Sequence, residues 1–150
     1  MVTMVLTEQH QMIRDSLRDF SQQQILPNAA RWDREREFPR EALTQLASLG
    51  AFGVAVPEAL GGAGLDYLAL ALVIEEIAAG DGGTSTIISV NNCPVCSIGM
   101  SYASDAQKKQ WLMPLAAGEM LGAFALTEPH AGSDASALRT TAMRLSLIHI

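Results

Sequence analysis

Residues 124–134, with the sequence FALTEPHAGSD, hold the highest concentration of groups that could bind a ligand. Thr127, Ser133 and Asp134 supply hydroxyl and carboxyl groups, and Gly132 lets the backbone come close to a bound molecule. No Lys or Arg occurs within this turn, so backbone amides and hydroxyls would have to do the binding. A polar, amide-rich turn of this kind can hold an anionic or uncharged polar cofactor. An ordinary turn between two domains is an alternative that fits the same residues.

Cys93 and Cys96 form a Cys-Pro-Val-Cys pair, a spacing found in zinc half-sites and in thiol redox centres. A structural zinc ion needs four ligands, and the sequence contains no second cysteine pair. His10, His130 and His149 are scattered, and the βαβ pattern of a thioredoxin-like site is absent. We therefore predict two buried helical cysteines and no metal site.

Glu75 and Glu76 are adjacent carboxylates, which could suggest acid–base chemistry. Neighbouring residues of a helix point about 100° apart, so these two do not share a site. We expect them to be paired locally or solvated. His130, between Pro129 and Ala131, could be catalytic, but a loop histidine that faces solvent is the simpler expectation.

The composition is that of a folded domain. Hydrophobic residues make up 49% of the 150 residues and charged residues 17%, which differs from the pattern of disordered chains. Ten basic residues stand against sixteen acidic ones, a balance that argues against nucleic-acid binding. No apolar window is long enough for a membrane span. With two cysteines and no secretory signal, a reducing, cytoplasmic setting is expected.

The N-terminal part of the sequence predicts an amphipathic helix over residues 8–24, which Pro27 should end. The run 31–40, RWDREREFPR, mixes charges of both signs and is predicted to be a solvated connection. Within it, Trp32 and Phe38 are expected to turn inward.

Further helices are expected over residues 40–49, 67–79, 84–102 and 105–113. Thr7, Asp66 and Ser104 are expected to cap the N-termini of three of the helices. The helix over 67–79 is apolar around most of its circumference, so we predict that it is central. Pro94 should make the helix over 84–102 irregular.

A change of composition at Leu121, from helical to strand-like and turn-like residues, predicts a domain boundary. Residues 121–126 have the composition of a short strand and lead into the polar turn. We expect residues 1–120 to form a helical domain and residues 121–144 to begin a second domain. Residues 145–150, LSLIHI, are expected to be non-native or the end of a truncated chain.

Four parts of the sequence together resemble the acyl-CoA dehydrogenase family. Leu126-Thr-Glu-Pro-His-Ala-Gly-Ser-Asp134 is similar to the family's Thr-Glu-Pro and Gly-Ser-Asp signature, which follows a short strand. Val56-Pro-Glu-Ala-Leu-Gly-Gly-Ala-Gly64 resembles its glycine loop, and Glu75-Glu76-Ile-Ala resembles the next helix. Residues 104–119 resemble the helix and link to the family's middle domain. The resemblance covers about residues 5–144, and the LSLIHI ending departs from it.

The resemblance implies an all-α N-terminal domain followed by the first strand and turn of a middle β-domain. It implies an FAD-dependent oxidoreductase that converts acyl-CoA to trans-2-enoyl-CoA, by removal of the α proton and transfer of the β hydride to flavin N5. In most of the family the base is a glutamate of the C-terminal domain. The chain is therefore expected to be an N-terminal fragment that has no catalytic residue and is inactive by itself.

Carried over to this chain, the resemblance assigns the FAD contacts to ten consecutive residues: Phe124, Ala125, Leu126, Thr127, Glu128, Pro129, His130, Ala131, Gly132 and Ser133. Leu126 and Thr127 are expected against the isoalloxazine ring, with backbone amides at its electron-accepting edge. Ser133 is also expected to bind the pantetheine arm of the substrate. The helices over 67–79 and 84–102 are expected to line part of the acyl-chain cavity.

The resemblance also implies partners and a compartment. Acyl-CoA is the expected substrate, electron-transfer flavoprotein the expected electron acceptor, and a homodimer or homotetramer the expected assembly. The bacterial cytoplasm is the expected location, or the mitochondrial matrix in a eukaryote. The alternatives are an acyl-CoA oxidase or another flavoenzyme of the same fold, and a helical interaction module without a cofactor.

Overall fold

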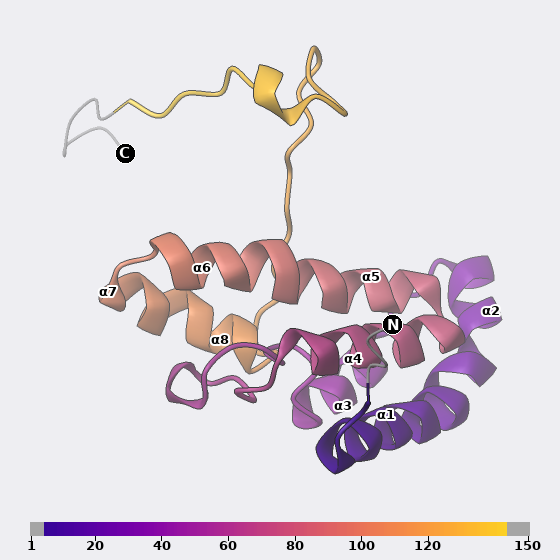
Figure 1. Ribbon diagram of the computed structural model, residues 1–150. Coiled ribbons are helices and arrows are strands. Elements are labelled where there is room, and N and C mark those ends of the chain that lie inside the picture. The colour runs from indigo at the N-terminus through magenta and orange to yellow at the C-terminus, as the bar shows by residue number, and fades with distance from the viewer. Residues whose placement is uncertain (1–4, 144–150) are drawn as a thin grey trace.

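In a computed structural model, residues 5–143 form a body of helices followed by an extended segment (Figure 1). The α-helices are α1 Glu8–Phe20, α2 Leu26–Glu35, α3 Arg40–Ser48, α4 Tyr67–Gly80, α5 Gly82–Val90, α6 Ser97–Tyr102, α7 Asp105–Gln107 and α8 Met113–Ala116. Three π turns each join one helix to the next: η1 Ser21–Ile25 joins α1 to α2, η3 Asn91–Cys96 joins α5 to α6, and η4 Lys108–Leu112 joins α7 to α8. The 3-10 turns are η2 Glu58–Leu60 and η5 Ala135–Ala137. The predicted all-α fold is confirmed, and no helix of the described residues is long and apolar enough to span a membrane.

Helix α4 lies in the centre of the body and packs against α1 and α5. Its buried residues cover much of its circumference, as predicted: Ala69, Leu70, Leu72, Val73, Glu76 and Ile77. Of these, Ala69, Leu70, Val73 and Ile77 belong to one core, together with residues of the surrounding elements that include Leu17, Leu46, Phe52 and Ile88. A smaller core, made of Val56, Cys96, Leu112 and Ala116, joins η3 to α8. Each large apolar side chain buried there contributes about 1.5–3 kcal/mol.

The three predicted N-caps are confirmed. The Thr7 hydroxyl accepts the backbone N–H of His10 at 3.2 Å, and the Asp66 carboxylate accepts that of Ala69 at 2.8 Å. The Ser104 hydroxyl accepts from the third residue of its helix at 3.3 Å. Each bond satisfies a backbone donor that the first helical turn leaves without a partner.

The prediction that Pro27 ends the first helix is wrong. The chain continues through η1 directly into α2, and Pro27 lies in the first turn of α2. The Leu26 N–H bonds to the Ser21 carbonyl five residues earlier, which is the wide spacing of a π turn. A proline needs no N–H partner in a first helical turn, so the π turn lets the helical path pass it.

The connection predicted over residues 31–40 is shorter in the structure, because α2 extends to Glu35. Trp32 is buried as expected, whereas Phe38 is 47% exposed, so its predicted inward position is wrong. The Arg40 guanidinium lies 5.7 Å from the centre of the Phe38 ring, a cation–π distance at the surface.

Pro94 lies inside η3, so the predicted irregularity of the helix between α5 and α6 is confirmed. The predicted end of the next helix at Met113 is wrong. Helix α8 begins there and continues to Ala116, with Pro114 in its first turn.

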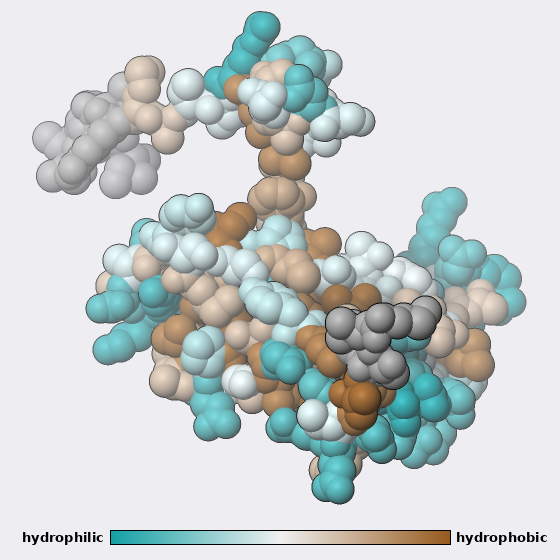
Figure 2. Space-filling model, viewed as in Figure 1, coloured by the Kyte–Doolittle hydropathy of each residue, from teal (hydrophilic) through white to brown (hydrophobic). Residues whose placement is uncertain are grey.

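After α8 the chain leaves the side of the α5–α6 rod and projects away from the helical body (Figure 1). Figure 2 shows hydrophobic colour along the narrow neck that joins this segment to the body. Residues 121–126, expected as a strand, are extended but pair with no strand in the described part of the chain. An isolated bridge between Glu128 and Ala131 follows. The division at residues 120 and 121 stays a prediction, and the expectation about residues 145–150 lies outside the described residues.

Candidate functional site

The ten residues predicted to bind a flavin lie together in the projecting segment. Most are exposed, Glu128 is half-buried and Ala131 is buried. Phe124 and Leu126 are 48% and 39% exposed, although both are large and apolar. A contiguous exposed apolar patch is typical of a surface that packs against another molecule or another part of a protein.

The backbone of this segment carries a run of free donors. Within the described residues, no N–H between Gly122 and Glu128 donates a hydrogen bond to another protein atom. The Thr127 and Ser133 hydroxyls likewise have no protein partner in residues 5–143. An extended chain with unpaired donors can bond to a polar ligand without breaking any bond of its own.

A tight turn follows the free amides. Glu128 and Ala131 exchange two backbone hydrogen bonds, with N–H to carbonyl distances of 2.9 and 3.1 Å. Pro129 and His130 occupy the corner between them. The His130 Nε2 lies 3.2 Å from the Glu128 carboxylate, and its side chain is 40% exposed. The prediction of a loop histidine that faces solvent is confirmed.

The Glu128 carboxylate is engaged with the chain that follows the turn. It accepts the backbone N–H groups of Arg139 and Thr140, both at 2.9 Å, and the Thr140 hydroxyl. The Thr140 hydroxyl and then the Arg139 amide hold the pKa of Glu128 below its usual range, because they bond to the charged form. Glu128 is therefore an anionic anchor for the turn and is not poised to take a proton.

Gly132 and Asp134 differ in their surroundings. A Cβ atom added to Gly132 would meet nothing within 4 Å, so the space beside its backbone is open. Asp134 is engaged locally, since its carboxylate accepts the N–H of Ser136 at 3.1 Å at the start of η5. Of the polar groups of the turn, Asp134 thus has a structural role of its own.

Sequence reasoning missed Asn91, which connects this segment to the body. Asn91 is completely buried, and its Oδ1 accepts the Gly122 N–H at 3.0 Å. Its Nδ2 donates to the carbonyls of Phe52 at 2.9 Å and Leu115 at 3.1 Å. The only local signal was a pair of asparagines in an apolar helix, close to Pro94.

The two cysteines of the pair differ in burial. Cys96 is buried, as predicted, and burial raises the pKa of its thiol to about 11. Cys93 is exposed, so the prediction that both are buried is wrong for Cys93. The part of the chain that the structure describes contains no group of three or more His, Cys, Asp or Glu arranged to hold a metal.

The adjacent glutamates also separate. Glu76 is buried and receives two bonds from the Arg18 guanidinium, at 2.7 and 3.1 Å, whereas Glu75 is exposed. The expectation of local pairing and solvation is confirmed. Because the two carboxylates do not share a site, they offer no acid–base pair.

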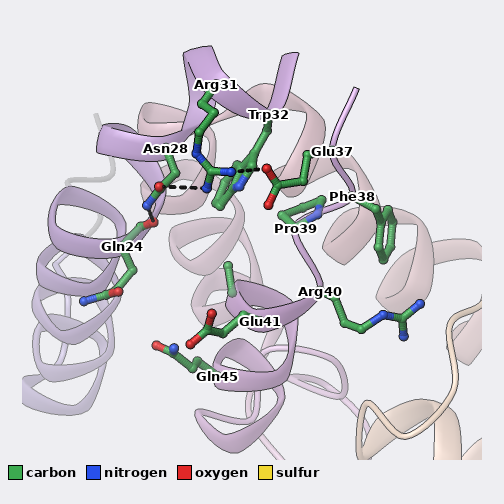
Figure 3. Close-up of a pocket in the computed structure, with 11 residues that line it drawn as sticks. Gln24, Asn28, Arg31, Trp32, Glu37, Phe38, Pro39, Arg40, Glu41 and Gln45 are labelled. Atoms are coloured by element: carbon green, nitrogen blue, oxygen red, sulfur yellow. Dashed lines mark hydrogen bonds and ion pairs between the residues drawn. The ribbon is translucent and has the colours of Figure 1, made fainter. Parts of the chain in front are cut away.

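Two hollows of about 320 Å³ lie in the helical body. The first lies between α2 and α3, where Arg31 donates to Glu37 and Asn28 (Figure 3). Arg31 and Glu37 are thus engaged with each other, and Arg40 stacks on the Phe38 ring at the edge of the hollow. The second is apolar, lies between α6 and η4, and includes Val95 and Trp111. Neither shares a residue with the predicted flavin segment.

Comparisons with known proteins give a family match for the helical body. A sequence profile of the acyl-CoA dehydrogenase N-terminal domain matches residues 7–119. The mitochondrial short-chain specific acyl-CoA dehydrogenase of Rattus norvegicus is 44% identical over 137 residues, which are 91% of this chain and 33% of that protein. The chain spans about a third of the length of the curated relatives that it matches.

Solved structures give the same result for the fold. A glutaryl-coenzyme A dehydrogenase in complex with glutaryl-CoA superposes with a TM-score of 0.86 at 36% identity, over 91% of this chain and 35% of the other. An acyl-CoA dehydrogenase from Bacillus anthracis, complexed with FAD, has a TM-score of 0.79 at 34% identity, over 89% of this chain and 23% of the other.

Proposed function

The chain belongs to the acyl-CoA dehydrogenase family, and on that premise we propose that it supplies part of the flavin site of an enzyme that oxidises acyl-CoA to trans-2-enoyl-CoA. The observation that carries this proposal is the run of backbone donors over residues 123–127 that find no acceptor among residues 5–143, beside the exposed side chains of Phe124 and Leu126.

The residues present fit FAD. The isoalloxazine ring has broad apolar faces and a polar edge of carbonyl oxygens and nitrogens, and it needs no cation along that edge in its oxidised form. Phe124 and Leu126 offer apolar contact, and the amides of residues 125–127 with the Thr127 hydroxyl offer donors. No Lys or Arg occurs from Gln110 to Leu138, so the segment itself offers no cationic side chain that would compete with these donors.

In the proposed mechanism, bound FAD supplies the acceptor for the β hydride. Backbone N–H groups of this segment would donate to the electron-accepting edge of the flavin, where fixed dipoles can stabilise negative charge without reorganising. Phe124 and Leu126 would exclude water from the ring. Ser133 would bind the pantetheine arm of the acyl-CoA, and α4 together with the helical run α5–η3–α6 would line part of the acyl-chain cavity.

The base that removes the α proton has no candidate in this segment. Glu128 is its carboxylate nearest to the free donors, and it is committed to Arg139 and Thr140. We therefore expect the 150-residue chain to show no turnover with added FAD and acyl-CoA. Flavin bleaching at a catalytic rate in such a mixture would contradict this expectation.

The proposal extends to partners and location. Electron-transfer flavoprotein is the proposed electron acceptor and a homodimer or homotetramer the proposed assembly, in the bacterial cytoplasm or, for a eukaryote, the mitochondrial matrix. Rapid reaction of the reduced enzyme with oxygen would instead indicate an acyl-CoA oxidase.

Replacing Thr127 with Val in the enzyme that contains this chain tests the flavin assignment. The change keeps the shape and removes one hydroxyl that has no protein partner, so the stability of the protein should stay unchanged. If the hydroxyl bonds to the flavin, its loss costs about 0.5–1.5 kcal/mol, or about 3 kcal/mol if a flavin acceptor stays unpaired. FAD affinity, measured by titration of the apoenzyme, should fall by up to about a hundredfold.

The matched control is Thr141→Val. Thr141 is exposed and makes no side-chain hydrogen bond within the described residues, whereas the Thr140 hydroxyl bonds to Glu128 and is unsuitable. Ser133→Ala should raise KM for acyl-CoA more than it weakens FAD binding. If all three variants have the same FAD affinity and the same KM for acyl-CoA, residues 124–134 only connect two parts of the chain, and the flavin assignment is wrong.

A further inference from the structure

The side-chain amide of Asn91 forms hydrogen bonds with the backbone of three separate segments of the chain. Its Nδ2 holds the carbonyl of Phe52 in the loop after α3 and the carbonyl of Leu115 in α8. Its Oδ1 holds the N–H of Gly122, at 3.0 Å, where the projecting segment begins. A fully satisfied buried amide of this kind has one preferred arrangement, because any shift leaves a buried polar group unpaired.

A steric contact reinforces the hydrogen bond. A Cβ atom at Gly122 would lie 2.6 Å from Cγ1 of Val95, so the Gly122 backbone rests directly against this side chain. Asn91 and Val95 both belong to the π turn η3. The same turn therefore fixes Gly122 both by a polar contact and by van der Waals contact.

Gly122 is also the last residue whose backbone N–H bonds to the helical body before the run of free donors begins. Within the described chain, the next five N–H groups have no protein acceptor. In an extended chain successive residues alternate between two sides, so the orientation of the Gly122 peptide sets which side Phe124 and Leu126 face. A displacement of about 1 Å at a reacting group can cost a hundredfold in rate.

We propose that Asn91 is a positioning residue for the flavin segment: through Gly122 it fixes the point and the direction in which residues 123–127 leave the helical body. This inference rests on the proposed function, because it assumes that the segment binds FAD. Asn91 itself touches neither the flavin nor the substrate in this proposal.

The neighbouring Asn92 provides a matched control. Asn92 is also buried and makes three hydrogen bonds: its Oδ1 accepts from Val54 at 2.9 Å, and its Nδ2 donates to Ala51 at 2.8 Å and Ile88 at 2.9 Å. All three partners lie in the helical body. Asn91→Ala and Asn92→Ala thus remove the same atoms and the same three kinds of backbone bond, with one additional weak contact of Asn91 to the Cys96 sulfur at 3.7 Å, but only Asn91→Ala frees Gly122.

The test uses the FAD-loaded enzyme that carries this chain, at a temperature where both variants are folded by circular dichroism. Asn92→Ala should lower Tm, keep the Gly122 amide protected from hydrogen exchange and leave the Kd for FAD unchanged. Asn91→Ala should expose the Gly122 amide and raise the Kd by about two- to tenfold, the value of one hydrogen bond. Equal effects of the two variants on Kd would reduce Asn91 to a structural residue and overturn the proposal.

A second pair of variants serves if Asn91→Ala does not fold. Gly122→Ala keeps the N–H but places a methyl group against Val95, so it should displace the segment and weaken FAD binding. The double variant Gly122→Ala/Val95→Ala makes room for that methyl group and should restore much of the affinity. Unchanged affinity in Gly122→Ala would overturn the proposal.

The two levels of inference fail differently. Absence of FAD binding by the unmodified enzyme would overturn the proposed function, and the flavin role of Asn91 with it. FAD binding that is insensitive to Asn91 and Gly122 would overturn the positioning role alone.

Discussion

His10 joins the first helix to the central one through the carboxylate of Asp66. The His10 Nε2 lies 3.0 Å from Asp66 Oδ1, although the two residues are 56 positions apart in the sequence. The other ring nitrogen, Nδ1, lies 2.9 Å from the hydroxyl of Thr7, which caps α1. Because Asp66 caps α4 at the same time, the N-termini of α1 and α4 share one hydrogen-bonded network.

This network predicts an acid-dependent loss of stability. The Ala69 amide, and then His10, lower the pKa of Asp66 because they bond to its charged form. A group whose pKa is lower in the folded state stabilises the fold above its unfolded pKa, about 3.9 for aspartate, and that stability is lost as pH falls through the folded value. Asp66→Asn should therefore lower Tm at neutral pH, and the difference from the unmodified protein should shrink below about pH 4.

Thermal unfolding followed by circular dichroism across this pH range measures the effect. Asp19→Asn is the control, because Asp19 is exposed on α1 and makes no hydrogen bond or ion pair within the described residues. A Tm difference for Asp66→Asn that stays constant down to about pH 2 would contradict the assignment.

The open space beside Gly132 gives a second prediction. A methyl group there meets no protein atom within 4 Å, so Gly132→Ala should change the free energy of unfolding by less than about 0.5 kcal/mol. If the Gly132 backbone approaches FAD closely, the same methyl group should weaken FAD binding. Urea unfolding and FAD titration of one variant separate the two effects, and an unchanged Kd would exclude a close approach at Gly132.

The split cysteine pair gives a third prediction. Cys93 is exposed and should react with a thiol reagent in the native protein at about pH 8, whereas the buried Cys96, with its raised pKa, should not. Cys93→Ser should abolish native labelling, and both thiols should react after unfolding. Labelling of Cys96 in the native protein, or stoichiometric zinc in the purified protein, would contradict this account.

The sequence predicts those features of the fold that depend on a few neighbouring residues. Thr7, Asp66 and Ser104 each precede a helix and bond within three residues, so the local pattern suffices. Pro27 misled the prediction because a proline ends a regular α-helix, while the π turn before it depends on how η1 packs against α4. The outward position of Phe38 likewise depends on where α2 ends.

The candidate site shows the same division. Residues 124–133 could be selected from their types and from a family resemblance, but the exposure of most of them and the amides of residues 124–127 that make no bond within the described chain required the structure. Asn91 gave no usable signal, because its role depends on Phe52, Leu115 and Gly122 meeting around one amide. The Thr140 N–H donates to the Glu128 carboxylate across 12 residues of sequence, and no local sequence pattern predicts this bond.

Hydrogen exchange at residues 123–127 tests the flavin assignment most directly. The measurement compares these backbone amides in the enzyme that contains this chain, with FAD bound and after its removal. The account predicts that exchange of these amides slows by about tenfold or more when FAD binds, and that Gly122 is protected in both states. Equal, fast exchange of all five amides in both states would contradict the claim that this segment binds flavin through its backbone.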